Sequence, residues 1–383
     1  MNKQQLLLRW SKKHKKKLTF HTSILAVILG VILSSSHLWV SAQDIPDVKK
    51  DEEAIFTASM VGDLMFSRHI EEVIQKKGYD FLFQYADPYF QMSDFVTGNF
   101  KHPIQIPGQE QPPNTNQVDT FSTSPRTIDE LTKRNFKSVS IANNRIYDYG
   151  YLGFRSTVNF FDQRDDIDAA GVMNDLDDTD CAVIYEHEGL TVATLGVSDI
   201  LEANSAATTF RPGIMPLTKP EIVMKAILTA AEKADMVLVH VHWGESFDSY
   251  INQRQRELAH AMSLAGADVI IGHYPHVVAP VEVYNDTIIF YSLGNFIFDQ
   301  GWSRTKQSVL AHYRLYEGGE AKMELVPFML SEGQPKPTKT PSISQKTWKR
   351  MLTKNLDPSQ WYEEEGHVII PLNHTRVTKA KGG

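Results

Sequence analysis

Short apolar runs alternate along the chain with segments in which apolar residues recur every three or four positions. The runs have strand length and predict buried strands at residues 55–61, 95–100, 139–142, 236–242, 269–271 and 287–293. The periodic segments predict helices at residues 68–77, 127–134, 155–163, 222–233 and 253–265. Two further runs, at 181–185 and 190–197, flank Glu188-Gly189 and predict a hairpin. Strands that alternate with helices are typical of a layered α/β fold.

Polar residues follow five of these strands at the point where each strand ends. In open α/β sheets, ligands bind beside the carboxyl ends of the strands, so we expect these residues to lie together. Asp, Asn and His side chains are ligands that divalent cations accept. Two such cations about 3.5–4 Å apart can bind a phosphoryl group and activate a water molecule. The five strand ends read Gly62-Asp63, Gly98-Asn99-Phe100-Lys101, Asn143-Asn144-Arg145, His242-Trp243-Gly244-Glu245 and Gly272-His273-Tyr274-Pro275-His276.

Each of these residues also has a purely structural interpretation. Asp63 alone could be a turn residue or a helix N-cap, but its place in a series of five strand ends favours a site. His273 and His276 are the strongest candidates, because a turn built from Gly and Pro has little packing need for two imidazoles. Imidazole is also the commonest metal ligand among side chains.

The remaining candidates are weighed by their immediate neighbours in the sequence. His240 and His242 share one face of their strand, and the Trp-Gly-Glu that follows favours His242 as the site residue. Asn143 could be a plain turn residue, and Asn144 is the better ligand candidate. For Glu245, a role in the site and a role as a cap at a helix entry are equally supported.

The N-terminal region combines a basic stretch with a long apolar one. Residues 1–21 carry seven Lys or Arg side chains and no acid, and residues 22–42 contain no Asp, Glu, Lys or Arg. About 20 apolar residues span a bilayer, and the basic flank predicts a cytoplasmic N-terminus with the main domain outside the cell membrane. Val40-Ser41-Ala42 resembles a signal-peptide cleavage site. The length of the apolar stretch favours an uncut signal anchor, with residues 43–53 as a stalk.

Charge and cysteine content narrow the classes of function. The net charge of the chain is −7, so the part that follows the seven N-terminal cations sums to −14, which argues against nucleic acid as a partner. Cys181 is the only cysteine, so no intramolecular disulfide forms. After about residue 330 the chain becomes rich in Pro, Lys, Ser and Thr. This predicts a main domain at residues 54–330 and a peripheral tail at 331–383, with one strand near 368–372.

Six motifs, taken in order, resemble the CapA/PgsA family of membrane-anchored subunits of bacterial poly-γ-glutamate capsule synthesis and export. The resemblance covers roughly residues 55–330, and such a series is far more specific than any one motif. It implies the four-layer α/β/β/α sandwich of calcineurin-like metallophosphatases, preceded by one N-terminal transmembrane helix. The motifs are Val61-Gly62-Asp63-Leu64-Met65, Gly98-Asn99-Phe100, Ala142-Asn143-Asn144, His242-Trp243-Gly244-Glu245, Gly272-His273-Tyr274-Pro275-His276-Val277 and Tyr291-Ser292-Leu293-Gly294-Asn295-Phe296-Ile297-Phe298-Asp299-Gln300.

The resemblance also implies a metal site and partners. The cofactor would be a divalent metal, namely Mn, Mg, Zn or Fe. The partners would be other capsule synthesis subunits (an amide ligase and a small membrane protein), the anionic poly-γ-glutamate polymer and the cytoplasmic membrane. The implied metal ligands are Asp63, Asn144, His242, His273 and His276.

Three residues depart from the family pattern. The family usually has Glu where this chain has Lys101 and His where it has Arg145, and it often has His at the place of Tyr274. By analogy with metallophosphatases, that Glu would bridge two metals and that His would donate a proton. Two unit charges ~4 Å apart interact by about 4 kcal/mol at an effective dielectric constant of 20, and a dication doubles this. Lys101 therefore predicts a weakened or absent two-metal centre. Lys101 and Arg145 could instead form an ion-pair cluster with Asp63, Glu245 and the histidines, and bind an anion.

Three functions follow from these patterns. The first is a membrane-anchored component of poly-γ-glutamate capsule synthesis or export. Because the body carries a charge of −14, direct binding of a polyanion would require a local basic pocket or bridging cations. The second is an active secreted metal-dependent phosphoesterase, against which Lys101 and Arg145 both count. The third is a structural ectodomain without a site. No catalytic residue is assigned, because Arg145 stands at the expected His position.

Overall fold

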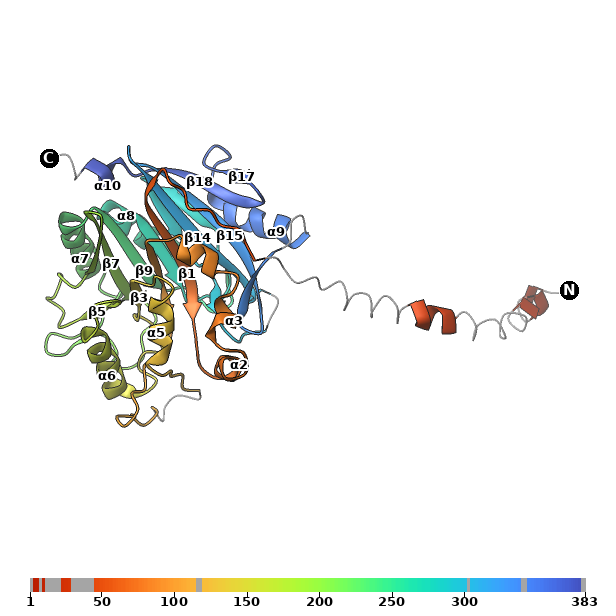
Figure 1. The fold of residues 1–383 in the computed structure, drawn as a ribbon, viewed down its shortest axis with the longest axis horizontal. Coiled ribbons are helices and arrows are strands. Elements are labelled where there is room, and N and C mark those ends of the chain that lie inside the picture. The colour runs from red at the N-terminus through yellow and green to blue at the C-terminus, as the bar shows by residue number, and fades with distance from the viewer. Residues whose placement is uncertain are drawn as a thin grey trace. The chain divides into compact units, whose positions relative to one another are not determined.

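The computed structural model describes residues 3–6, 9–10, 22–28, 45–114, 119–301, 304–338 and 343–379. The chain divides into two compact units, Met1–Asp44 and Ile45–Gly383, and each is described by itself (Figure 1). In the first unit, residues 3–6, 9–10 and 22–28 are helical. None of the helices that the structure describes is long and apolar enough to cross a membrane. Most of the predicted transmembrane segment, from residue 29 to 42, lies outside the described residues, so that segment stays a prediction.

The second unit contains two large sheets, and the larger has ten strands. Its centre is β1, which pairs in parallel with β2 on one side and antiparallel with β14 on the other. The main strand order is β17 (Tyr362–Glu364), β18 (His367–Asn373), β15 (Glu320–Ser331), β14 (Gln307–Tyr316), β1 (Ala54–Leu64), β2 (Phe95–Phe100), β3 (Ser138–Ser140) and β4 (Asp168–Ala170). Two short strands join this sheet off the main path: β13 (Asn295–Ile297) pairs with β1, and β16 (Gln334–Pro337) pairs with β15.

The smaller sheet has six strands, and its four central strands are parallel. Their order is β11 (Val281–Tyr284), β12 (Thr287–Phe290), β10 (Val269–His273), β9 (Met236–His242), β7 (Leu190–Ser198) and β6 (Val183–His187). The predicted hairpin is β6–β7, which pairs antiparallel around Glu188-Gly189. A separate two-stranded ladder joins β5 (Val172–Met173) to β8 (Gly213–Ile214).

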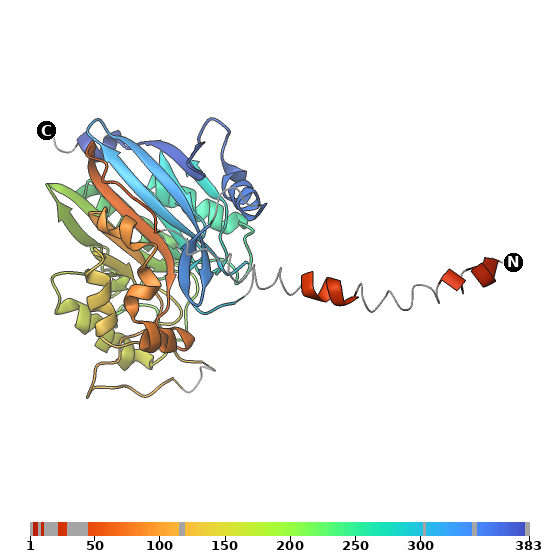
Figure 2. The same cartoon turned by 45° about the vertical axis from the view of Figure 1, so that its right-hand side comes forward.

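The helices and the two sheets form four layers, and one hydrophobic cluster lies between each layer and the next (Figures 1 and 2). One cluster fills the space between the outer face of the larger sheet and five helices, α2 (His69–Lys77), α3 (Tyr79–Phe83), α4 (Asp87–Gln91), α5 (Arg126–Thr132) and α6 (Gly150–Asp162). A second lies between the two sheets and includes side chains of α9 (Ile343–Leu352) and α10 (Thr375–Lys379). The third joins the smaller sheet to α7 (Pro220–Lys233) and α8 (Gln253–Leu264).

The side chains of strand β9 alternate between two of these hydrophobic clusters. Met236 and Leu238 belong to the cluster between the sheets, whereas Val237, Val239 and Val241 pack toward α7 and α8. All five are fully buried, and each such side chain contributes roughly 1.5–3 kcal/mol by leaving water. Because side chains alternate between the two faces of a strand, one apolar run serves two cores.

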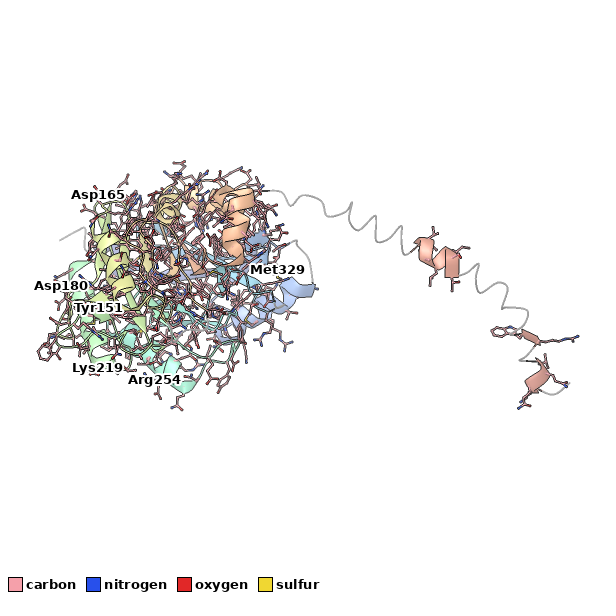
Figure 3. The ribbon with its side chains drawn as sticks, turned by 90° about the horizontal axis from the view of Figure 1, so that it is seen from below. Tyr151, Asp165, Asp180, Lys219, Arg254 and Met329 are labelled. Atoms are coloured by element: carbon pink, nitrogen blue, oxygen red, sulfur yellow. The ribbon has the colours of Figure 1, made fainter. Side chains whose placement is uncertain are left out.

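The two helices over the smaller sheet begin side by side. Helix α8 begins at a capping box, in which the Asn252 side chain and Gln255 satisfy each other's backbone N–H groups. Arg254, in its first turn, donates a 3.3 Å hydrogen bond to the carbonyl of Leu217, just before α7. Figure 3 labels Arg254 and Lys219, and both lie where these helices start.

The predicted core strands and helices all occur, with boundaries shifted by a few residues. The C-terminal region differs from the expected peripheral tail at 331–383. Its strand β18 lies between β15 and β17 and pairs with β15 along six positions. Val368, Ile370 and Leu372 alternate into the cluster between the sheets. The Pro- and Lys-rich stretch that precedes this strand itself contains β16, which pairs with β15, so its composition did not indicate the strands of this region.

Candidate functional site

The polar strand ends meet because the registers of both sheets bring them level. In the larger sheet Asp63 of β1 pairs with Asn99 of β2, and in the smaller sheet His242 of β9 pairs with His273 of β10. The sheets face each other, and His273 Nδ1 comes within 3.5 Å of Asp63 Oδ1. We call the five buried side chains that gather here the strand-end cluster: Asp63, Lys101, His242, His273 and His276.

Lys101 lies at the centre of the strand-end cluster. Its Nζ donates a 3.0 Å hydrogen bond to Asp63 Oδ2 and lies 3.3 Å from His276 Nε2. The two charged side chains are only 2% and 1% exposed. Burial raises the pKa of Asp63, but Lys101 and the two histidines more than offset this and hold the pKa well below its usual value. Asp63 is therefore ionised, and its charge is balanced by the ammonium group.

The hydrogen bonds fix the tautomer of His276. An ammonium group can only donate, so His276 Nε2 must accept from Lys101. Its Nδ1 lies 2.8 Å from Asn295 Oδ1 and must donate. The Asn295 amide is itself oriented, because its Nδ2 donates to Gln300 Oε1 and to the carbonyl of Thr305. Burial, followed by the charge of Lys101, lowers the pKa of His276, so the imidazole is neutral.

The other histidines extend the cluster toward the smaller sheet. His240 Nδ1 lies 2.9 Å from His273 Nε2, and His240 Nε2 lies 2.9 Å from Thr97 Oγ1. His242 Nε2 lies 3.1 Å from Asn144 Oδ1. Burial is the main cause that lowers the pKa of all three of these imidazoles. His240, which the sequence context placed behind His242 as a site residue, thus holds His273 in place.

Two buried imidazole nitrogens of the strand-end cluster lack a hydrogen-bond partner. They are His242 Nδ1 and His273 Nδ1. The distance of 3.5 Å from His273 Nδ1 to Asp63 Oδ1 is at the outer limit of a hydrogen bond, so we treat the atom as unsatisfied. A buried polar atom without a partner costs about 1–3 kcal/mol, and such atoms are often found where a ligand binds.

Two asparagines link the strand ends of the larger sheet. Asn99 Nδ2 donates a 2.7 Å hydrogen bond to Asp63 Oδ1. Asn143 Nδ2 donates to Asn99 Oδ1 and to the carbonyl of Phe100. Asn143 Oδ1 then accepts from the backbone N–H of Arg145. Both asparagines are buried and position their neighbours. The sequence motifs contained both, but their spacing alone did not separate them from turn residues.

The turn that carries His273 and His276 has an unusual backbone. Tyr274 has φ 93° and His276 has φ 58°, although neither is glycine. Positive φ costs a residue with a side chain of order 1–3 kcal/mol and persists where the surroundings impose it. At His276 the hydrogen bonds of the side chain to Lys101 and Asn295 stabilise this conformation.

A cavity of about 220 Å³ opens beside the strand-end cluster. Three cations line it, Arg68, Lys101 and Arg145, and its lining contains no carboxylate. The guanidinium groups of Arg68 and Arg145 each stack on the Phe121 ring, at 4.4 and 4.3 Å from its centroid. We call this the cationic cavity. Its other lining residues are Phe121, Asn144, Ser246, Phe247, Tyr274, His276, Phe298 and Gln300.

Each cation of the cationic cavity has a carboxylate behind it. Arg68 forms an ion pair with Asp299. Arg145 Nη1 donates to the carbonyl of Asp119 and lies 3.5 Å from Asp148 Oδ2. Burial raises the pKa of Asp148 to about 6, against a hydrogen bond from the Phe121 backbone and the charge of Arg145. The arginines are therefore held in fixed directions by groups outside the cavity.

The structure brings most of the predicted site residues together, with two exceptions. Asp63, Lys101, His273 and His276 are in contact, and Asn144 joins them through His242.

Arg145 lines the cavity but forms its ion pair with Asp148, not with Asp63 as we expected. Glu245 is exposed, and in the part of the chain that the structure describes its carboxylate makes no ion pair or hydrogen bond with the strand-end cluster. The turn at Gly244, with φ 85°, directs the chain outward before Glu245. Sequence reasoning missed Arg68 and Phe121, which lie in loops and belong to no motif.

The described residues contain no group of three or more His, Cys, Asp or Glu side chains that could hold a metal ion. Asp63 Oδ2 and His276 Nε2, which would face a metal, both face the Lys101 ammonium instead.

The two facing sheets, with polar residues at their strand ends, define a layered α/β protein with a candidate site at the strand ends. Comparison with known sequences identifies its family. The sequence profile of the family described as bacterial capsule synthesis protein PGA_cap matches residues 57–300. The chain belongs to this family. The PGA biosynthesis protein CapA of Bacillus subtilis (strain 168) is 39% identical over 376 residues, which cover 98% of this chain and 97% of the relative. The capsule biosynthesis protein CapA of Bacillus anthracis is 37% identical over 380 residues, with 98% and 92% covered.

Solved structures with a related arrangement are more distant. A hypothetical protein from Thermus thermophilus aligns over 73% of this chain and 96% of its own, with 13% identity and a TM-score of 0.40. A putative 5'-nucleotidase from Staphylococcus aureus aligns over 85% of this chain and 58% of its own, with the same identity and TM-score. A likeness this remote carries no argument about the activity of this protein.

Proposed function

We propose that the protein is a component of poly-γ-glutamate capsule synthesis or export. The observation that carries the proposal is the match to a relative described as a PGA biosynthesis protein, over nearly the whole length of both chains. The family profile, which covers the strand ends from Asp63 to the loop after Phe298, supports it further. An amide ligase and a small membrane protein are the partners we propose within the synthesis machinery.

We propose an arrangement at the membrane on the basis of the sequence. The basic residues 1–21 and the apolar residues 22–42 would anchor the chain in the cell membrane with the N-terminus in the cytoplasm. Residues 43–53 would be the stalk, and the sheets, a four-layer sandwich of the metallophosphatase type, would lie outside. Fusion of a topology reporter to the C-terminus tests this, and a reporter that is active only in the cytoplasm would contradict it.

The side chains of the strand-end cluster do not fit a two-metal centre. A Lys101 ammonium that donates to Asp63 and His276 uses the lone pairs that a metal would need. A dication about 4 Å away would be repelled by roughly 8 kcal/mol at an effective dielectric constant of 20. We therefore propose that the site contributes by binding or assembly and not through a pair of metals.

Metal analysis of the purified full chain tests the proposed loss of the two-metal centre. We expect less than one tightly bound divalent cation per chain, and more in a Lys101→Glu variant, which replaces the cation by the carboxylate usual in the family. Two tightly bound dications in the unaltered chain would overturn this part of the proposal.

The cellular role is tested by deleting the gene and measuring the polymer at the cell surface. We expect the polymer to be lost and to return when the unaltered gene is supplied. An unchanged amount of surface polymer in the deletion strain would overturn the proposed function.

A second candidate function is a metal-dependent phosphoesterase. The observation that favours it is the pair of buried, unsatisfied nitrogens, His242 Nδ1 and His273 Nδ1, because imidazole nitrogens are common ligands of a divalent cation. Such a cation would act as a Lewis acid when bound. Hydrolysis of a phosphate monoester by the full chain with added Mn²⁺, lost in His242→Ala, would establish this function in place of binding or assembly.

A further inference from the structure

The cationic cavity has the features of a small binding site. At about 220 Å³ it is smaller than the roughly 300–1,000 Å³ of pockets that hold drug-sized ligands, so it accepts one small group or one residue of a chain. All its charged lining residues are cations, although the body of the protein is acidic. This local reversal of sign favours an anionic ligand.

The buried ammonium of Lys101 has a donor left for that ligand. An ammonium group carries three N–H donors, and among the described residues two acceptors lie within hydrogen-bond distance, Asp63 Oδ2 and His276 Nε2. Lys101 also lines the cavity. Its Nζ also lies 5.5 Å from the centroid of the Tyr274 ring and 5.9 Å from that of the Phe298 ring. Both rings line the cavity, so a ligand that packs against them lies beside the third donor.

Each cation of the cavity is paired with a carboxylate, and this favours a ligand group that carries a single negative charge. Arg68 is paired with Asp299, Lys101 with Asp63 and Arg145 with Asp148. Because each cation is already paired with a carboxylate outside the cavity, a compact group that carries two charges, such as phosphate, would gain too little to replace its hydration. A carboxylate carries one charge and matches the planar fork of a guanidinium group.

The aromatic residues of the lining indicate which kind of ligand carries the carboxylate. Phe121, Phe247, Tyr274 and Phe298 all border the cavity. Aromatic faces accept methylene groups, which leave water at a gain of about 0.8 kcal/mol each. The ligand should therefore carry its carboxylate on a short aliphatic segment.

We propose that the cationic cavity binds one carboxylate borne on a short aliphatic chain, of the kind found on a glutamyl residue, between Lys101 and Arg145. The choice of a glutamyl ligand rests on the proposed role in poly-γ-glutamate synthesis. The carboxylate accepts hydrogen bonds from the ammonium and a guanidinium group, and the methylenes lie against the aromatic rings. No bond is formed or broken.

The test is calorimetric titration of the full chain with glutarate, in which three methylenes separate two carboxylate groups of one charge each. Glutaramide, its uncharged isostere, and inorganic phosphate serve as the comparison ligands. We expect glutarate to bind at least tenfold more tightly than either. Equal affinity for glutaramide, tighter binding of phosphate, or no binding of glutarate would overturn the proposal.

Variants locate the site. Arg145→Gln should weaken glutarate binding at least tenfold. The matched control is Arg164→Gln, because Arg164 is 20% exposed against 24% for Arg145, also pairs with Asp side chains and also stacks on a phenylalanine. We expect the control to bind glutarate within twofold of the unaltered chain. Equal losses in both variants, or none in Arg145→Gln, would place the ligand elsewhere and overturn the proposal.

The experiments test the carboxylate site and the proposed cellular function independently. If the gene deletion removes surface polymer but glutarate does not bind, only the carboxylate site is overturned. If glutarate binds at Arg145 but the deletion leaves the polymer unchanged, the proposed cellular function is overturned and the carboxylate site stands.

Discussion

At the scale of single residues, one ammonium group determines the chemistry of the candidate site. Lys101 turns Asp63 into the partner of an ion pair and His276 into a hydrogen-bond acceptor. The sequence predicted that these three residues would meet, because all follow strands of one layered fold. It did not predict that Arg68 lines the cavity. Arg68 lies in a loop and itself has a φ of 56°. Contacts made through loops leave no periodic signal in a sequence.

Replacing Lys101 by Met tests the ion pair. The variant leaves Asp63 buried without its counter-ion, and removing one partner of a buried pair costs about 3–5 kcal/mol. We expect a loss of that size in the free energy of unfolding, measured by urea denaturation. The control is Lys133→Met, whose side chain is 65% exposed beside Glu130, and it should change stability by at most about 1 kcal/mol.

A double variant keeps this test decisive. Adding Asp63→Asn to Lys101→Met removes the uncompensated charge, so much of the lost stability should return. If the single variant were as stable as the unaltered chain, Asp63 would not be the buried anion described here.

His102 predicts a dependence of stability on pH. Its Nε2 accepts a 2.9 Å hydrogen bond from the Phe66 N–H, and burial lowers the pKa of His102 to about 3. The unfolded chain has an ordinary histidine with a pKa near 6.5. Below pH 6.5 the unfolded state therefore binds a proton that the folded state does not, and each pH unit costs about 1.4 kcal/mol. This stability is complete above pH 6.5 and is lost as the pH falls toward 3.

The measurement is the free energy of unfolding between pH 7 and pH 4. His102→Gln, which retains an acceptor, should flatten the slope by about one proton. His69→Gln should not, because the side chain of His69 is 55% exposed. Equal slopes in the unaltered chain and in His102→Gln would contradict the neutral buried imidazole.

At the scale of elements, close approaches of the backbone bring the strand ends into register. A Cβ on Gly62 would lie 1.9 Å from the carbonyl oxygen of Gly294, and one on Gly272 would lie 2.1 Å from that of Tyr291. The glycines that precede Asp63 and His273 therefore let neighbouring backbone pass directly beside the site. Both glycines stand in the sequence motifs, but the sequence does not show which segment lies against each one, because that segment is more than ten residues away in each case.

Gly62→Ala tests this close approach. The added methyl must push apart β1 and the loop before β13, and overpacking of this kind costs typically 1–3 kcal/mol or more. The control is Gly318→Ala, where an added Cβ meets nothing within 4 Å, so the change should stay within about 0.5 kcal/mol. Thermal unfolding of the two variants, measured side by side, decides the matter. Equal melting temperatures would mean that the strands can separate at no cost.

At the scale of the whole molecule, the alternation of apolar strands with helices predicted a layered α/β fold, but residues 331–383, expected as a peripheral tail, contribute β17 and β18 to the larger sheet. A continuous apolar run identifies a buried strand, so β1, β9 and β10 were predicted correctly. It does not say which strand pairs with which. Strand β18 was expected near residues 368–372, yet its place beside β15 depends on pairing between residues about 48 positions apart. Pairing over that range has no local signature.

Ile370→Ala tests whether the C-terminal strand belongs to the core. Ile370 is fully buried between the sheets, and such a truncation costs about 2–5 kcal/mol. Ile184→Ala is the control, because Ile184 is 43% exposed on β6. Chemical denaturation should show a large loss of stability only for Ile370→Ala. Similar small losses of stability in both variants would mean that the residues after 331 form a peripheral tail.

The position of β18 has a consequence for how the chain matures. Ribosomes deliver the N-terminus first, so β15 emerges while the strand that will cover its edge has not yet been made. An uncovered edge strand is a template for pairing with other chains. The residues of β18 thus control when this edge of the sheet is covered, and chains whose translation stops before β18 would be prone to pair with one another.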